Sequence, residues 1–444
     1  MLKQFLAILG VSVLMVLNAV VATAAQHDAA FSDKYELSKM VVLSRHNIRS
    51  PLSGSGATID ELTPHKWFAW TSAPSELSLK GGQLETIMGQ YFRRYLAKEK
   101  LIMENYLPQA GEVRFYANSK QRTIATAHYF SAGMLPIANI TIEHKYDPEN
   151  TDMTFSPRLI FMSEEFKAEA QNEISRMKFG DWRKGAVKKL AENYLTLEKI
   201  LDFKDSPMAR QKSLKHLIAD DPEILLEQGK QPSVKGTLKI ANAAADALIL
   251  QYYEESDDAK DGFGRKLTDG EWAQISNIKA VYDGLLFTAP DVAVNVAHPL
   301  VKLIDEELSL PNRKFTFLCG HDSNIASVLA ALGVEDYTLP NAIEPKTPIG
   351  SKFVIEKWVG RDGEEYASLS LVYQSVAQLR ARSSLTPDNP PMIYRLELKG
   401  LQKNRDGLYL MRDVKDRFQK TLDAYDELGR VVNRSINDEE RQAA

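Results

Sequence analysis

The stretch that decides the fold is FTFLCGHDSNIASVLAALG, residues 315–333. Residues 315–319 form a short apolar run, which is typical of a buried strand. The polar residues 320–324 follow, and a helical apolar pattern then continues through Leu332 and stops at Gly333. The stretch therefore predicts a strand, a polar turn and a helix in direct succession.

The same order occurs in two earlier segments of the chain. Each has a short apolar strand, then a polar cluster with basic side chains, and then a helix. The segments are strand 40–43, cluster SRHNIRSP at 44–51 and helix 80–98, and strand 112–117, cluster NSKQR at 118–122 and helix 123–132. Alternating strands and helices favour a parallel α/β sheet, in which ligands bind beyond the carboxyl ends of the strands. We therefore expect the three clusters to converge in space.

The middle and the end of the chain have different patterns. From about residue 158 to residue 278 the helical period dominates, which predicts an inserted all-helical domain. Beyond it, strands are expected at 353–358, 367–373 and 392–398, with a hairpin turn at 360–363 and a closing helix at 414–431. The predicted class is α/β, with a mixed, largely parallel sheet flanked by helices. The predicted limits are 1–24 for a signal peptide, 31–157 and 286–444 for the α/β domain, and 158–285 for the helical domain.

The first residues have the features of an export signal. Lys3 precedes an apolar run from Phe5 to Val21, and the small residues of 22–24, ATA, follow it. This pattern favours a secretory signal peptide over a membrane anchor. No later stretch approaches the ~18 consecutive apolar residues of a spanning helix. We expect a periplasmic mature protein without a membrane span.

Composition narrows the classes of function. The formal net charge of −4 argues against general nucleic-acid binding. The eight histidines show no HxH or HExxH spacing, so we expect no metal and no other cofactor. Cys319 is the single cysteine, so no intramolecular disulfide forms. A small buried residue at a strand end is favoured for Cys319 over a catalytic thiol, which needs a base and electropositive surroundings.

The basic side chains of the first two clusters predict a phosphate pocket. Arg45, Arg49 and Arg122 each offer a planar fork of N–H donors that suits phosphate oxygens. The third cluster opens a helix, and helix N-termini attract phosphate. For one arginine at a strand end, a surface salt bridge is the simpler interpretation. Two arginines around a histidine favour the pocket, and the expected partner is a small phosphorylated substrate.

His46 and Asp322 are the candidate catalytic residues. The charges of its arginine neighbours favour the neutral form of His46, whose free nitrogen can attack phosphorus and form a phosphohistidine. The alternative is a satisfied core histidine. Asp322 can give a proton to the leaving oxygen and then activate water, although a helix N-cap is a common role for aspartate. His321 is expected to donate a hydrogen bond to the phosphate.

These clusters resemble the signatures of a known family, the histidine acid phosphatases. Residues 45–51 are similar to the RHGxRxP signature, residues 320–324 to the second signature, and residues 118–127 to the segment with the third phosphate-binding arginine. The resemblance runs from about residue 36 to residue 420. It implies an α/β domain interrupted by a helical domain, with His46 as nucleophile and Asp322 as proton donor. It also implies that the phosphate is bound by Arg45, Arg49, Arg122 and His321.

Within that family the chain most resembles bacterial periplasmic glucose-1-phosphatases. Asn47 stands where phytases usually have glycine, and further similarity lies in residues 251–254, 294–301 and 347–350. The resemblance implies that Glu254 contacts the substrate from the helical domain. Enteric relatives have several disulfides and this chain can form none, so substrate preference carries over less safely than mechanism.

The predicted function is hydrolysis of sugar phosphates, glucose 1-phosphate first among them, and three alternatives remain. A phytase requires a strongly basic pocket rim, and the acidic stretch 254–261 argues modestly against it. A mutase acts on metabolites that are mainly cytosolic, which the signal peptide disfavours. A phosphate-binding protein needs the arginines but has no use for His46 together with Asp322.

Overall fold

The structure is a computed structural model of the 444-residue chain. It describes residues 29–52, 56–145, 152–176, 187–217 and 223–443. The signal peptide predicted for residues 1–24 lies outside these ranges. Among the described residues, no single helix is both long and apolar enough to cross a membrane; two successive helices, Asp269–Phe287 and Pro290–Ser309, meet that test only as a pair, bent by 83°.

A seven-stranded mixed sheet forms the centre of the α/β part, in the order β2-β5-β1-β6-β7-β8, with β9 paired to β7. The strands are β1 (Tyr35–Arg45), β2 (Val113–Ala117), β5 (Phe315–Gly320), β6 (Lys352–Gly360), β7 (Glu365–Tyr373), β8 (Met392–Arg395) and β9 (Tyr409–Leu410). The mixed α/β class is confirmed. However, only β1, β2 and β5 pair in parallel, and every pairing of β6, β7, β8 and β9 is antiparallel. The expectation of a largely parallel sheet therefore needs correction, because short connections such as the turn at 361–364 reverse the chain direction.

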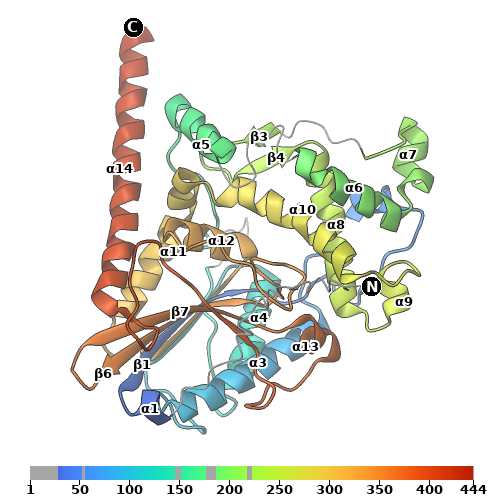
Figure 1. The fold of residues 1–444 in the computed structure, drawn as a ribbon. Helices are drawn as coiled ribbons and strands as arrows, with labels where there is room; N and C mark the ends of the chain where they lie inside the picture. Colours follow the sequence, from blue (N-terminus) through green and yellow to red (C-terminus); the bar gives the residue numbers. More distant parts are fainter. Residues whose placement is uncertain (1–28, 53–55, 146–151, 177–186, 218–222, 444) are drawn as a thin grey trace, which may run out of the picture.

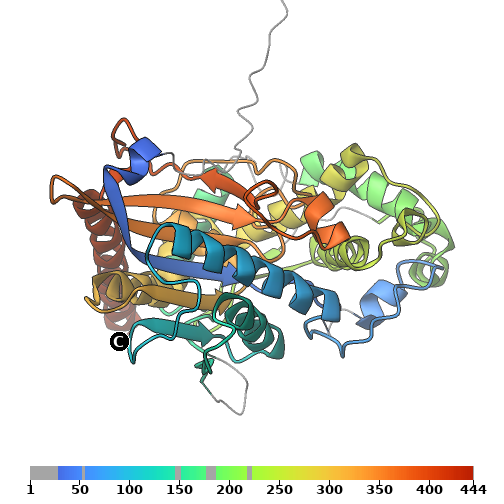
Figure 2. The same cartoon turned by 90° about the horizontal axis from the view of Figure 1, so that it is seen from below.

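Helices cover both faces of this sheet (Figures 1 and 2). On one face, α3 (Leu79–Lys98) and α4 (Gln121–Met134) share a core with alternate strand residues such as Val42 and Phe317. On the other face, α11 (Pro290–Ser309), α12 (Asp322–Ala331) and α14 (Met411–Ala443) pack on Val41 and Leu318. Successive strand residues point to opposite faces, so each strand contributes to both cores. Three short helices lie outside these layers: α1 (Ala29–Ser32) contacts β1, whereas α2 (Gly56–Asp60) and α13 (Val376–Ala381) contact α8 (Thr237–Glu254) of the helical segment.

The predicted helical segment lies on the side toward which the blue strand β1 points in Figure 2, at the carboxyl end of that strand. Its helices are α5 (Glu164–Arg176), α6 (Val187–Leu201), α7 (Pro207–Lys212), α8 (Thr237–Glu254), α9 (Asp258–Asp261) and α10 (Asp269–Phe287). A two-stranded hairpin, β3 (Glu223–Leu225) with β4 (Ser233–Lys235), adds a small β element to it. The helices share an apolar core that also includes α/β residues such as Ile48, Leu84 and Ile349, and α10 contacts α12 of the α/β part. We propose 158–285 as an inserted domain on this basis.

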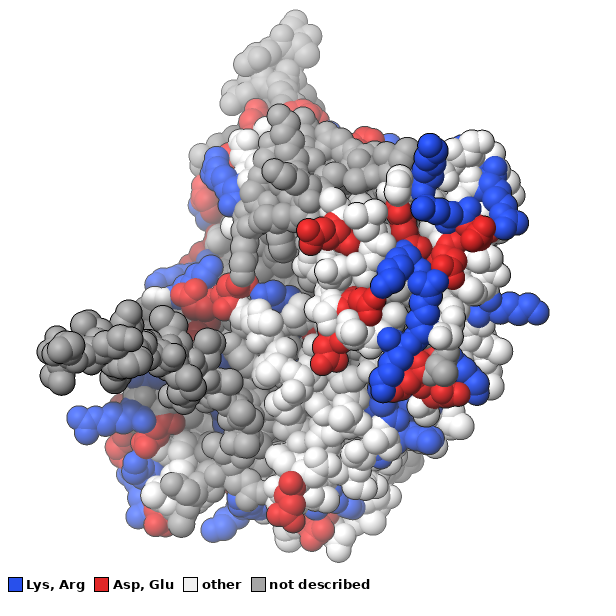
Figure 3. Space-filling model, turned by 45° about the vertical axis from the view of Figure 1, so that its right-hand side comes forward, with Lys and Arg blue, Asp and Glu red and all other residues white. Residues whose placement is uncertain are grey.

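Charged side chains on the exposed helices pair locally. Lys260 lies 3.3 Å from Asp257, and Lys266 lies 3.2 Å from Asp258. On the face drawn in Figure 3, acidic and basic side chains of the described residues are intermixed. Exposed pairs of this kind contribute about 0–1 kcal/mol each, so these charges act mainly as a solvated surface.

Candidate active site

The three polar clusters leave the sheet at one edge. Strand β5 lies between β1 and β2, and Cys319 is in register with Ser44 on one side and with Ala117 on the other. Because the three strands are parallel, their carboxyl ends coincide. Backbone hydrogen bonds continue beyond the strands, from His46 N to the Gly320 oxygen at 3.1 Å and from Asn118 N to the Cys319 oxygen at 2.9 Å. The predicted convergence of the three clusters is therefore present.

His46 is held as a neutral imidazole with one nitrogen available. The side chain is 3% exposed, and its Nδ1 lies 2.9 Å from the Asn47 carbonyl oxygen, to which it donates. This fixes the proton on Nδ1 and leaves the Nε2 lone pair free. Burial, and then the charge of Arg122, lower the pKa of His46 well below its usual value. The ring centroid lies 5.4 Å from that of His321.

The side chain of Asn47 points away from His46, into a buried ion pair. Its Nδ2 donates to Glu85 Oε1 at 2.7 Å, and Lys352 Nζ donates to the same oxygen at 3.1 Å. Asn47 Oδ1 accepts from Ile48 N at 2.8 Å. Asn47 therefore anchors the loop whose carbonyl orients His46. Sequence reasoning singled out Asn47 but missed Glu85 and Lys352, because their roles depend on contacts across the sheet.

The three predicted arginines present unsatisfied donors inside the protein. Arg45 donates at 2.6 Å to Glu344, Arg49 donates at 2.9 Å to Asp246, and Arg122 donates at 3.4 Å to the Ser75 carbonyl. Among the described residues, the Nε atoms of all three arginines are buried and have no hydrogen-bond partner. Burial and the neighbouring Arg49 charge lower the pKa of Arg122 to about 10. Buried unpaired donors and repelling cations both favour binding of an anion here.

Asp322 is the first residue of α12, and its two oxygens have different partners. Oδ1 accepts from Ser323 N at 2.9 Å within the first turn of the helix, whose N-cap is His321, so the N-cap role considered for Asp322 is not present. Oδ2 lies 2.8 Å from Lys279 Nζ and 3.3 Å from Arg45 Nη2. Burial alone would raise the pKa of Asp322, but the charges of Lys279 and Arg45 outweigh it and hold the pKa well below its usual value. These contacts favour the ionised form of Asp322.

His321 is positioned by Asn118. Asn118 Oδ1 accepts from Ser119 N at 2.7 Å, which fixes the orientation of the amide, so its Nδ2 faces His321 Nε2 at 2.7 Å. His321 Nε2 is therefore the acceptor, and Nδ1 carries the proton. Burial, and then the charge of Arg122, lower the pKa of His321 well below its usual value. A neutral ring with one N–H donor suits a phosphate oxygen.

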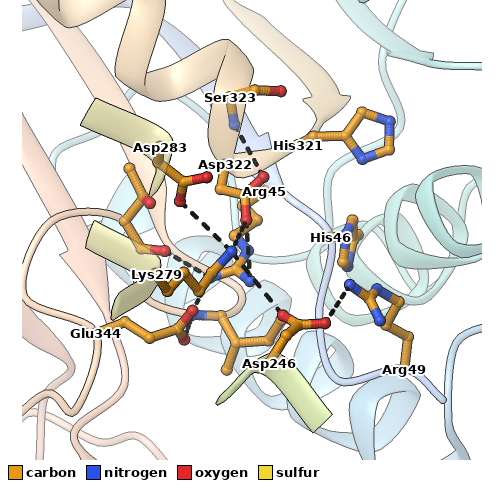
Figure 4. Close-up of polar contacts among 12 residues, drawn as sticks. Arg45, His46, Arg49, Asp246, Lys279, Asp283, His321, Asp322, Ser323 and Glu344 are labelled. Atoms are coloured by element: carbon orange, nitrogen blue, oxygen red, sulfur yellow. Dashed lines mark hydrogen bonds and ion pairs between the residues drawn. The ribbon is translucent and has the colours of Figure 1, made fainter. Parts of the chain in front are cut away.

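The helical part supplies charged groups that sequence reasoning missed. Lys279 Nζ lies 2.8 Å from Asp322, 3.4 Å from Asp283 and 3.9 Å from Asp246 (Figure 4). Lys279 and Asp283 are four residues apart on α10, a helix with many buried apolar side chains. In the sequence, such a pair in an apolar helix is only a weak indication of a functional site. Glu344, the partner of Arg45, lies in a loop and has no such signal.

Glu254 lies at the end of α8, beside the start of α3. Ser78 Oγ donates to Glu254 Oε2 at 2.7 Å, and Ser78 N donates to the Ile48 oxygen at 2.9 Å. Burial raises the pKa of Glu254, against the opposing effect of the Ser78 hydrogen bond. Ser78 thus connects Glu254 to the loop of residues 45–49. Among the described residues, Glu254 itself has no hydrogen bond to Arg45, Arg49 or Arg122.

The acidic stretch 254–261 is largely paired. Arg380 binds Asp258, and it donates to Asp261 at 2.9 Å. Its guanidinium also lies 3.9 Å from the centre of the Tyr252 ring. These contacts join the helical part to α13. The net negative charge that this stretch presents is therefore smaller than its sequence suggests, and it argues less against a phytase.

Two further features bear on the chemistry. Cys319 is fully buried and free, and burial raises the pKa of its thiol well above the usual value, which fits a structural residue. Within the described ranges, no group of three or more His, Cys, Asp or Glu side chains is arranged to hold a metal ion. The positive charges of this site come from arginine and lysine side chains.

Comparisons with known proteins agree with this geometry. The model of the histidine phosphatase superfamily (branch 2) matches residues 36–374. The glucose-1-phosphatase of Salmonella typhimurium is 37% identical over 398 residues, which cover 88% of this chain and 94% of that protein. The glucose-1-phosphatase of Providencia rettgeri is 35% identical over 393 residues, which cover 87% and 92%.

A solved structure shares the fold. The apo form of a Hafnia alvei phytase superposes with a TM-score of 0.80 at 24% identity, covering 88% of this chain and 97% of that chain. The family match and the two relatives above extend over most of the sequence. The chain therefore belongs to branch 2 of the histidine phosphatase superfamily, and it is a phosphoric monoester hydrolase.

Proposed function

We propose that this phosphatase hydrolyses glucose 1-phosphate through a phosphohistidine on His46. The observation that carries the mechanism is the buried, neutral His46 imidazole among three arginines with unpaired Nε donors. In the first step, Nε2 of His46 attacks phosphorus and the bond from phosphorus to the sugar oxygen breaks. In the second step, water attacks the phosphohistidine, so inorganic phosphate leaves and the imidazole is restored.

Arg45, Arg49 and Arg122 would bind the phosphoryl oxygens in both steps, with the Nδ1–H of His321 as a further donor. Preorganised donors of this kind stabilise the charge of a phosphoryl group in flight. Their Nη atoms are already fixed by Glu344, Asp246 and the Ser75 carbonyl. With the Nη atoms held in this way, the guanidinium groups would bind the anion without a large rearrangement.

Asp322 would give its proton to the leaving sugar oxygen and then take one from the attacking water. Before substrate binds, its ion pairs with Lys279 and Arg45 favour the ionised form. A phosphate monoester brings about two negative charges beside Arg45 at neutral pH. These charges offset the cation and raise the pKa of Asp322 in the complex relative to the empty enzyme.

Two considerations favour glucose 1-phosphate over phytate. The relatives that are 35% and 37% identical are named glucose-1-phosphatases. The helical part also places Asp246, Asp283 and Glu254 near the arginines or the loop that holds them. Carboxylates at these places would repel the additional phosphates of inositol hexakisphosphate, whereas they would accept hydrogen bonds from sugar hydroxyls.

The function is tested with a substrate panel on the wild type and on Glu254→Ala. The wild type should have a higher kcat/KM for glucose 1-phosphate than for glucose 6-phosphate, phytate or p-nitrophenyl phosphate. The variant should lose about ten- to a hundredfold in kcat/KM for glucose 1-phosphate, because a lost hydrogen bond to a charged group costs about 1.5–3 kcal/mol. Activity on p-nitrophenyl phosphate, which has no sugar hydroxyls, should stay nearly constant, and activity on phytate should hold or rise.

Glu254→Gln is the matched control, since it keeps an acceptor for Ser78 and removes only the charge. It should retain more glucose 1-phosphate activity than the alanine variant and show the same gain on phytate. If Glu254→Ala leaves the ratio of glucose 1-phosphate to p-nitrophenyl phosphate activity unchanged, Glu254 is only a structural partner of Ser78. A wild type with its highest kcat/KM on phytate would instead make this enzyme a phytase.

Chelation is expected to leave turnover intact. Arginine and lysine charges surround the phosphate site, and guanidinium groups can neutralise the transferred group without a cation. Prolonged EDTA treatment should therefore keep kcat within error of the untreated enzyme, while vanadate should inhibit. Loss of activity on chelation, with recovery on adding zinc or magnesium, would contradict the arginine-based site.

We also propose a periplasmic location. The support is the leader-like pattern of Lys3, the apolar run to Val21 and the small residues at 22–24. An enzyme in this location would act on sugar phosphates that are released outside the cytosol. Hydrolysis requires no second substrate except water.

A further inference from the structure

The role of Lys279 is not explained by phosphate binding alone. Its side chain is 10% exposed, and its ammonium group faces three carboxylates, with Asp322 nearest at 2.8 Å. Lys279 belongs to α10, whereas Asp322 begins α12 of the α/β part, and these two helices are in contact. The contact between Lys279 and Asp322 therefore joins the helical segment directly to the group that we assign as proton donor.

We propose that Lys279 is a positioning residue for the proton donor: it holds the Asp322 carboxyl beside the phosphate site and sets the pH at which that carboxyl is protonated. The inference rests on the proposed role of Asp322 in proton transfer. It adds a residue to the reaction that neither the family signatures nor the spacing in the sequence indicates.

The geometry supports this role in two ways. Both cations, Lys279 and Arg45, contact the same oxygen, Asp322 Oδ2, while Oδ1 is occupied by the backbone of Ser323. A proton on Asp322 must therefore compete with these cations. When phosphate binds, its charge offsets Arg45, and Lys279 remains as the cation that opposes protonation of Oδ2.

Lys279 also has the means to stay in place as Asp322 changes its charge. An ammonium group has three N–H donors, and the two other carboxylates, Asp283 and Asp246, lie 3.4 Å and 3.9 Å from Nζ. When Asp322 becomes neutral, these carboxylates still hold the ammonium near it (Figure 4). Asp246 is itself fixed by Arg49 at 2.9 Å.

Other charged groups act on Asp322 as well. The groups that face it or its partners are Arg45 and His46 from β1 and its loop, Arg122 from α4, Asp246 from α8, Lys279 and Asp283 from α10, His321 beside it, and Glu344 behind Arg45. The cations lower the pKa of Asp322 and the carboxylates raise it. Of the cations in contact with Oδ2, only Lys279 comes from the helical part, and it lies closest.

Lys279→Met removes this charge and keeps much of the side-chain volume. The pKa of Asp322 should then rise, because an opposite charge next to a carboxyl lowers its pKa by about 1–3 units. Asp322 would stay protonated to higher pH in the enzyme–substrate complex. The alkaline limb of kcat against pH for glucose 1-phosphate should therefore move up by about one to three pH units. Lys279→Arg, which keeps the charge, should leave the limb close to that of the wild type.

Lys39→Met is the matched control. Lys39 is a buried lysine on β1 whose ammonium donates at 3.1 Å to the carbonyls of Glu307 and Leu308, away from the site. The same chemical change there should alter stability without moving the limb. If Lys279→Met does not fold, Lys279→Gln, which keeps a donor toward Asp322, should move the limb in the same direction.

A second comparison isolates the route through Asp322. In an Asp322→Asn background, adding Lys279→Met should produce no further change in the pH profile. Two results would overturn the proposal. One is that Lys279→Met lowers kcat by the same factor at every pH and leaves the alkaline limb in place. The other is that Lys279→Met still moves the limb in the Asp322→Asn background. If Asp322→Asn itself affects good and poor leaving groups equally, the proton-donor role falls, and the role of Lys279 falls with it. A limb that stays in place in Lys279→Met while Asp322→Asn discriminates between leaving groups overturns the Lys279 role alone.

Discussion

His46→Ala is expected to lower kcat for glucose 1-phosphate by about 10⁴- to 10⁶-fold, the range seen when catalytic residues that act as a unit are removed from another hydrolase. The reason is that His46 is the candidate nucleophile beside three arginines whose Nε donors have no partner among the described residues. The fold should survive, because Asn47 and the Glu85–Lys352 pair hold the loop independently of the His46 ring.

The measurement has two parts. Steady-state turnover compares the wild type with His46→Ala, and rapid acid-free quenching of the wild type with labelled substrate tests for a phosphoryl group that is labile in acid and stable in alkali. His298→Ala serves as the control. The ring of this half-buried histidine stacks on that of Tyr425, with 3.6 Å between the ring centroids, away from the site. The variant should keep full turnover. A label found on serine or aspartate would contradict the phosphohistidine mechanism.

Asp322→Asn is expected to slow hydrolysis of poor leaving groups by about 10²- to 10⁴-fold, the usual contribution of general acid catalysis. A sugar alkoxide requires a proton as it departs, whereas p-nitrophenolate is stable without one. The loss on p-nitrophenyl phosphate should therefore be much smaller. Because asparagine can still accept from Ser323 N, the contact at Oδ1 is kept and the comparison concerns the proton.

Single-turnover rates on the two substrates measure this difference directly. Asp202→Asn is a suitable control. Asp202 belongs to the helical part and lies 2.7 Å from His65 Nε2. Its replacement should have a small and equal effect on the rates for both substrates. An equal large loss on both substrates in Asp322→Asn would assign Asp322 to the helix end and to binding of Lys279, and would remove it from proton transfer.

The local sequence pattern predicted many helices and strands of this protein. The strand, cluster and helix order at 315–333 appears in the structure as β5 and α12, with bounds shifted by a residue or so. The helices expected at 80–98 and 123–132 are α3 and α4. These predictions succeed because side-chain periodicity and chain adjacency are local properties. For the same reason the position of His46 between Arg45 and Arg49 follows from the sequence, whereas Asp322, predicted just before the helix, is its first residue.

The ends of several helices and strands differ from the prediction, because an end can depend on contacts outside the local pattern. Strand β1 runs over Tyr35–Arg45, well beyond the predicted 40–43, because its N-terminal half pairs with β6 as far as the Tyr35–Gly360 partners. Helix α14 continues to Ala443, beyond the expected 431. The strand predicted for 392–398 ends at Arg395. For the two strands, pairing with a partner strand that the sequence window does not contain sets the end.

The tertiary structure alone decided how the site is charged and oriented. Strand β5 lies between β1 and β2, and this order brings together clusters that are separated by about 70 and about 200 residues of sequence. Asn47 turns its amide to a buried Glu85–Lys352 pair, and Lys279 reaches Asp322 from another part of the chain. Such pairings depend on burial of both partners, because a charge removed from water must find its counter-charge wherever the folded chain supplies one. The sequence by itself determined which residues can bind and attack a phosphate, and the packing of α8 and α10 against the sheet determined which carboxylates and which lysine control their protons.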